Sequence, residues 1–191
     1  HRHSKTWLTI PILSENHRQK TIRDMRIDNS RNWTKKHLAT LLQTYSRSKY
    51  FKDHFEPFVR NFYSKVNNLQ FAIDVMELSL FSLFELLEIK PVIVRLSKLD
   101  ANFTDSSLVD PKVNQGSARL IRICKQLEAT TYYSGIASTK YINLNAFREA
   151  NIRVFWQHYR HPVYNQDVSK RHSAAESKFI SHLSILDALA N

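Results

Sequence analysis

Residues 117–159 read SARLIRICKQLEATTYYSGIASTKYINLNAFREANIRVFWQHY and alternate between helical and extended patterns. Residues 117–128 place apolar side chains at helical spacing, which predicts a helix. Residues 130–133 and 152–159 are rich in β-branched and aromatic side chains, as strands are. A short helix over residues 144–150 separates them. A strand, a helix and a second strand in this order predict an α/β fold, with a mostly parallel sheet flanked by helices.

Residues 30–88, ahead of this region, predict a helical insertion. Its clearest signal is an aromatic stripe at i, i+4, i+7 and i+11, made by Phe51, Phe55, Phe58 and Phe62. Pro57 interrupts the stripe, so it either bends this helix or opens a new one in its first turn.

The remaining signals outside residues 117–159 are less regular. A long helix is expected from a cap at Asn68 to about Glu88. Apolar runs predict further strands at residues 6–13, 21–27 and 91–96. We expect one domain over residues 1–191.

The composition excludes several kinds of site. Gly116 and Gly135 are the two glycines of the chain, whereas a dinucleotide-binding turn or a Walker A loop needs two or three close together. One cysteine, Cys124, excludes an internal disulfide and cysteine-rich zinc sites. The histidines show no metal-binding spacing, so no catalytic metal is expected. A lone thiol, no signal-peptide pattern and no membrane span together favour a cytoplasmic location.

The charge is large and unevenly distributed. The formal net charge is +11. Residues 1–52 carry +9, residues 53–110 carry −4 and residues 111–191 carry +6. Basic ends around an acidic middle suggest an anionic ligand, such as a nucleotide sugar or RNA, although simple solubility explains the charge as well.

Several short strings along the chain resemble the WbqC-like family. They are WLTIP from residue 7, IDNS from residue 27 with W33 and KKHL from residue 35, SKYF from residue 48, RLIRICK from residue 119, YSG from residue 133 with Y141, HPVY from residue 161 with Q166, and LSILD from residue 183 with N191. Family members usually begin with an earlier strand and an HQPNYLPW-like motif. That motif is not in this sequence, so we expect that the chain lacks the family's N-terminal segment.

The resemblance implies a bacterial protein of O-antigen and other surface-polysaccharide (lipopolysaccharide) gene clusters. A role proposed for the family is that of a transferase, which moves glycine, an aminoacyl group, onto an amino sugar. The resemblance leaves the cofactor unknown.

The catalytic candidates are His161 and Asp187. His161 follows the strand at 152–159, and ligands of parallel sheets bind beyond the carboxyl ends of the strands. Imidazole groups accept protons near neutral pH, so His161 is the candidate base for the sugar amine. Asp187 is the candidate carboxylate that orients it. The alternatives are a turn held by Pro162 and a helix-terminal charge.

The substrate-binding candidates are expected to hold the nucleotide and the sugar near these two residues. Gly135 allows a positive φ or close approach of the backbone to a phosphate, and arginines grip phosphate with two hydrogen bonds. Tyr164 and Gln166 are expected to position the sugar. Trp33 and His37 share one helix face, where a core role is the simpler explanation, and a solvated face is the simpler explanation for the arginines. The full set is Ser134, Gly135, Tyr141, Tyr164, Gln166, Trp33, His37, Arg119, Arg122 and Asn191.

The preferred function is acylation of an amino sugar carried on a nucleotide. One alternative is a non-catalytic module that binds RNA or a nucleotide. RNA is the less favoured partner, because no recognisable RNA motif is present. The other alternative is a scaffold of a glycan-assembly complex.

Overall fold

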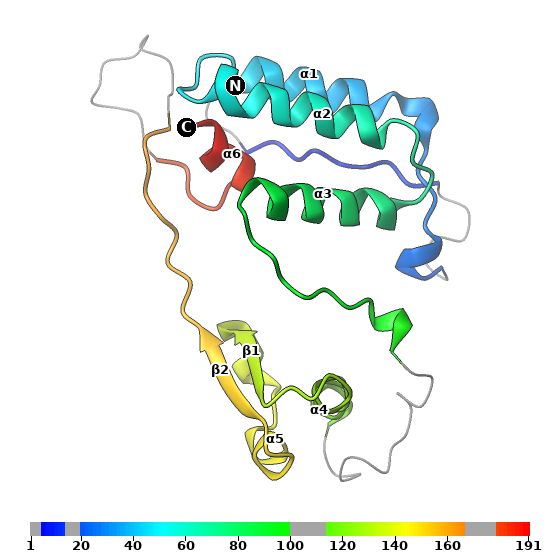
Figure 1. Ribbon diagram of the computed structural model, residues 1–191, viewed down its shortest axis with the longest axis vertical. Coiled ribbons are helices and arrows are strands. Elements are labelled where there is room, and N and C mark those ends of the chain that lie inside the picture. The colour runs from blue at the N-terminus through cyan, green and yellow to red at the C-terminus, as the bar shows by residue number, and fades with distance from the viewer. Residues whose placement is uncertain (1–4, 14–19, 100–113, 167–178) are drawn as a thin grey trace. The chain divides into compact units, whose positions relative to one another are not determined.

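The structure is a computed structural model that describes residues 5–13, 20–99, 114–166 and 179–191. These residues form two compact units, each described here by itself. Unit 1 combines residues 1–90 with 161–191, and unit 2 is residues 91–160. Unit 1 contains the helices α1 (Trp33–Tyr45), α2 (Glu56–Val66), α3 (Ala72–Leu86) and α6 (Ile185–Ala190). Unit 2 contains α4 (Gln115–Gln126), β1 (Thr131–Gly135), α5 (Leu144–Glu149) and β2 (Arg153–Gln157) (Figure 1). The expected single domain stays a prediction.

The aromatic stripe of the predicted helical insertion builds the core of unit 1. Phe51 and Phe55 are buried on a turn of π-helix, and Phe58 and Phe62 are half-buried against the same core on α2. Pro57 lies in the first turn of α2, where its missing N–H costs no hydrogen bond. It therefore opens a new helix, one of the two outcomes expected from the sequence.

The C-terminal helix α6 belongs to this same core, although it is far away in sequence. Ala190 is fully buried among the apolar side chains of unit 1. The backbone N–H of Tyr50 donates to its carbonyl at 3.1 Å. The end of the chain is therefore packed against the turn of π-helix that precedes α2.

The strands expected at residues 6–13 and 21–27 are wrong. Only isolated antiparallel bridges form there, joining Ile12 to Ile27 and Arg26 to Phe71. Thr21 explains part of the difference, because its hydroxyl donates to Asp24 at 2.6 Å and stabilises a 3-10 turn over Ile22–Asp24. Such local side-chain bonds compete with strand formation.

The strand expected at residues 91–96 is also wrong. Residues 91–95 are exposed and form no regular element, and a 3-10 turn follows at Leu96–Lys98. A β-branched run becomes a strand only when another strand pairs with it. The long helix, α3, begins at Ala72 rather than after Asn68, and Phe71 occupies its N-cap position.

The parallel sheet that residues 117–159 predict is present in unit 2. β1 pairs with β2 in parallel, with Thr131 beside Arg153 and Gly135 beside Gln157. One face packs on α4 and α5 around the buried Ile121 and Phe147. Helices flanking a small parallel sheet, with a helical region around residues 30–88, make the fold α/β as expected.

Candidate functional site

Asp187, in the first turn of α6, is the centre of a polar cluster in unit 1. It is only 5% exposed. Its Oδ1 accepts from the Tyr45 hydroxyl at 3.0 Å, and its Oδ2 accepts from the Tyr164 hydroxyl at 2.7 Å and the Gln166 amide at 2.9 Å. A buried carboxylate costs free energy unless it is hydrogen-bonded, and these three donors meet that need.

The same cluster fixes the segment 161–166 to α6. The Gln166 side chain both donates to the carbonyl of Ile180 at 2.9 Å and accepts from its N–H at 2.8 Å. Asn191 donates to the backbone carbonyl of Asp187 at 2.9 Å and accepts from the Ser48 hydroxyl at 3.0 Å. Four of the predicted site residues are therefore brought together: Tyr164, Gln166, Asp187 and Asn191.

His161 lies beside this cluster in a group of rings. Its ring centroid is 6.3 Å from that of Tyr164, 5.7 Å from Phe179 and 5.1 Å from His182. Its Nδ1 donates to the carbonyl of Pro162 at 2.8 Å, since a carbonyl can only accept. In the neutral imidazole this places the lone pair on Nε2, as a general base requires.

Asp187 reaches His161 through Tyr164. The carboxylate holds the Tyr164 hydroxyl, and the ring of Tyr164 lies against the imidazole. Burial, and then the charge of Asp187, raise the pKa of Tyr45, so its phenol stays a hydrogen-bond donor at neutral pH. Asp187 thus holds the segment that carries His161 through Tyr164 and Gln166, and its role in catalysis stays a prediction.

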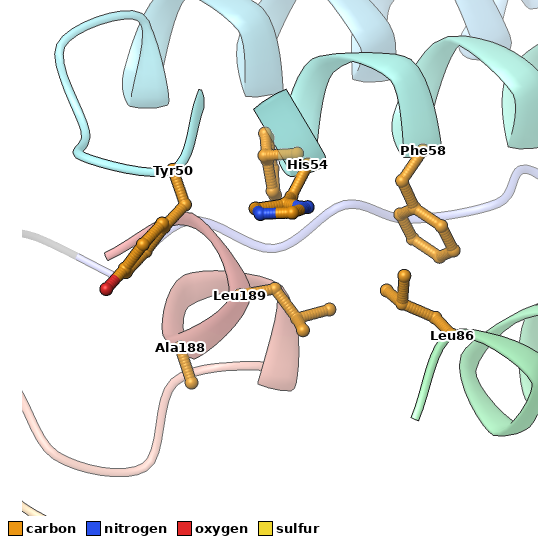
Figure 2. A pocket seen from close by; sticks show the side chains of 7 residues that line it. Tyr50, His54, Phe58, Leu86, Ala188 and Leu189 are labelled. Atoms are coloured by element: carbon orange, nitrogen blue, oxygen red, sulfur yellow. The ribbon is translucent and has the colours of Figure 1, made fainter. Parts of the chain in front are cut away.

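A pocket of about 340 Å³ adjoins α6 within unit 1. Figure 2 shows His54 and Phe58 opposite Leu86 of α3 and Leu189 of α6. Tyr50 and Ala188 complete the labelled walls. The walls are apolar apart from one phenol and one imidazole, and none of the predicted site residues lines this pocket.

Trp33 and His37 lie in the core of unit 1. The Nε2 of His37 donates to the carbonyl of Thr9 at 3.1 Å, and its ring packs edge-on against Trp33 and Tyr63. The indole N–H of Trp33 donates to Asn29 at 3.1 Å. Burial lowers the pKa of His37, and the Thr9 bond partly opposes that shift. These contacts support the core interpretation, and a binding role stays a prediction.

Ser134 and Gly135 end β1 in unit 2. The buried Ser134 hydroxyl shares a hydrogen bond of 2.6 Å with Ser138, which also donates to the Gly135 carbonyl at 2.6 Å. Of the two possibilities that this glycine allows, a positive φ is not adopted, because its φ is −68°. A Cβ built there meets no atom within 4 Å, so the space for a close approach to the backbone is present.

The other predicted residues of unit 2 lie on and beside α4. Arg119 is exposed and Arg122 is half-buried. The carbonyl of Tyr141 accepts from the Asn114 amide at 3.0 Å, which ties it to the N-terminus of α4, while its side chain is exposed. Among the described residues, no three His, Cys, Asp or Glu side chains gather as metal ligands would.

Sequence reasoning missed four residues of these clusters. They are Tyr45, Ser48, Ser138 and His182. Tyr45 is the last residue of α1, and nothing local marks it as the partner of a carboxylate 142 residues later. Ser48 belongs to the SKYF string that carries part of the family resemblance, which is the one signal that points to it.

No helix among the described residues is long and apolar enough to cross a membrane. No curated protein and no solved structure matches the chain. The family model described as "WbqC-like protein family" matches residues 1–191, the whole of the sequence. The chain therefore belongs to the WbqC-like protein family.

Proposed function

We propose that this protein acts in bacterial surface-polysaccharide (O-antigen) biosynthesis, as a cytoplasmic transferase that moves an aminoacyl group onto a nucleotide-linked amino sugar. Family membership supports the biological setting. The observation that carries the reaction is the arrangement of His161, whose Nδ1–H is engaged by Pro162 and whose ring lies against Tyr164. Asp187 in turn holds Tyr164.

The reaction takes two protons from the sugar nitrogen, one before and one after the new bond forms, and needs no redox partner. The sugar ammonium gives its proton to Nε2 of His161 and becomes a nucleophilic amine. The amine nitrogen attacks the carbonyl carbon of the activated aminoacyl group. A new N–C bond forms, the bond from that carbon to its leaving group breaks, and the leaving group departs with the electron pair. The second proton of the nitrogen passes to the leaving group or to water, which leaves a neutral amide. Glycine is the aminoacyl group that the family resemblance suggests.

The charge of the chain suits such a substrate. A nucleotide-linked sugar carries a diphosphate, and the formal net charge is +11. Arginines on α4 and the strand end at Gly135 remain our candidates for the phosphate contact. Tyr164 and Gln166 are the candidates for contact with the sugar.

The experiment is a transfer assay with the full-length protein. A nucleotide-linked sugar with a free amine is incubated with glycyl thioester, glycyl adenylate or glycyl-tRNA, and the acylated sugar nucleotide is detected by mass. We expect His161→Ala to lower turnover by about 10²- to 10⁴-fold. His158→Gln, a change at an exposed histidine just after β2, is the matched control and should retain full turnover.

Two results would contradict this proposal. Full activity of a folded His161→Ala protein would remove the base from the mechanism. Tight binding of RNA that weakens by about 10³-fold or more between 50 and 200 mM salt, with no transfer to any sugar, would favour an RNA-binding module instead.

A further inference from the structure

One face of the two-stranded sheet has no described residue of unit 2 packed over it. Burial alternates along both strands. Tyr132, Ser134, Val154 and Trp156 are buried or half-buried, and the remaining residues of the two strands are exposed. Tyr133 is 65% exposed and Phe155 is 49% exposed. These two residues are paired in register, so their rings project from neighbouring strands about 4.8 Å apart.

This exposure is unusual for a parallel sheet. Parallel sheets are normally covered on both faces, because the connections between their strands cover them. The described residues of unit 2 cover one face only, and the space beside Gly135 on the other face is empty for at least 4 Å. Two exposed aromatic rings side by side form an apolar patch, and exposed apolar patches can mark ligand-binding sites.

The charge around this face is strongly positive. The described residues of unit 2 contain nine lysines and arginines and two acidic residues. Arg153 is on the open face itself, two positions before Phe155, and the face holds no acidic residue. Gln157 and Gly135 end the face at the carboxyl ends of the strands, where ligands of parallel sheets bind.

We propose that this face of unit 2 binds a nucleotide, whose base stacks on a platform formed by Tyr133 and Phe155. The occupant is a planar, anionic ligand. Aromatic rings stack on the faces of all nucleobases, and the Gln157 amide offers both a donor and an acceptor to the edge of the base. The Arg153 guanidinium is a further candidate to pair with the phosphates, beside the arginines on α4 and the strand end at Gly135. The inference rests on the proposed function, because that function supplies the nucleotide.

The test measures binding of uridine diphosphate and adenosine diphosphate to the full chain by calorimetry. Uridine, which lacks the diphosphate, and inorganic pyrophosphate, which lacks the nucleoside, are the comparison ligands. Tyr133→Ala and Phe155→Ala should each weaken the binding of uridine diphosphate and adenosine diphosphate about 5- to 150-fold. Tyr133→Phe, which keeps the ring, should stay within about twofold, and pyrophosphate binding should not change. Arg153→Gln should remove the preference for uridine diphosphate over uridine. Leu144→Ala, at a residue of α5 with 47% exposure, is the control.

The outcomes separate this inference from the proposed function. If the wild type binds nucleotide and both ring variants bind it equally well, the platform is wrong and the transferase proposal stands. If the wild type binds no nucleotide, both fail. A dimer that both ring variants dissolve would assign the face to a second copy of the chain and overturn the inference. Tighter binding of single-stranded RNA, lost in the same variants, would also overturn it.

Discussion

Asp187 is the residue on which the polar cluster of unit 1 depends. Three donors point at its carboxylate, and it is buried. Asp187→Asn removes the charge and turns one acceptor into a donor, so at least one buried donor loses its partner. We expect the free energy of unfolding to fall by about 2 kcal/mol, measured by urea denaturation.

The control for this variant is Asp53→Asn, at an exposed carboxylate on the turn of π-helix. It should stay within about 0.5 kcal/mol of the wild type. Equal stability of the two variants would show that the three hydrogen bonds of Asp187 add nothing to the fold. In the transfer assay, Tyr164→Phe should reproduce part of the loss of Asp187→Asn if Asp187 acts through Tyr164.

His37 predicts a pH dependence of stability. Burial lowers its pKa below the ordinary 6.5. At a pH between the lowered pKa of His37 in the folded protein and its ordinary pKa in the unfolded chain, only the unfolded chain binds the proton. The free energy of unfolding therefore falls as the pH drops below about 6.5. His37→Gln keeps a donor for the Thr9 carbonyl and does not titrate. Urea denaturation from about pH 8 to about pH 5.5 should therefore show a shallower decline for this variant, and equal slopes would contradict the prediction.

At the scale of elements, a Phe→Ala substitution should destabilise unit 2 much more on the covered face of the sheet than on the open face. Phe147 is fully buried in unit 2, whereas Phe155 stands on the open face. Phe147→Ala should lower the free energy of unfolding of unit 2 by about 3–5 kcal/mol. Phe155→Ala should cost about 1 kcal/mol or less, the value of one cross-strand contact. Thermal denaturation followed by circular dichroism measures both, and a large loss in Phe155→Ala would mean that its face is covered.

The elements that the sequence predicts well are those whose signal is local. α4 has apolar residues at helical spacing and a cap, Asn114, whose side chain accepts from the N–H of Ser117 at 2.9 Å. Residues 91–96 carry an equally clear strand signal, yet they form none, because a strand needs a partner that its own sequence does not specify. A helix closes its hydrogen bonds within itself, and a strand does not.

At the scale of the whole molecule, the candidate site depends on contacts between distant parts of the chain. The sequence analysis named Tyr164, Gln166 and Asp187 as candidates for one site because they belong to neighbouring strings that resemble the WbqC-like family. Tyr45 and Ser48 joined them only in the structure, since hydrogen bonds across more than 140 residues leave no trace in local spacing. The core of unit 1 is likewise made from both ends of the sequence.

This discontinuous arrangement leads to a prediction about unfolding. Ala190 has no exposed surface and packs in the core of unit 1. Ala190→Asp places an unpaired charge there, which costs several kcal/mol. Trp33 reports on unit 1 and Trp156 on unit 2, and the exposed Trp7 responds little to unfolding. Ala190→Asp is measured in two backgrounds: Trp156→Phe leaves Trp33 as the reporter, and Trp33→Phe leaves Trp156. Ala190→Asp should lower the urea midpoint reported by Trp33 and leave the midpoint reported by Trp156 unchanged.

The matched control for this last experiment is Ala39→Asp, the same substitution at an exposed position of α1. It adds the same charge without burying it, so the midpoint reported by Trp33 should hardly move. If Ala190→Asp shifts the two tryptophan signals together, the two units unfold as one cooperative body. If only Trp33 responds, unit 2 is stabilised by its own core around Ile121 and Phe147, independently of the core of unit 1.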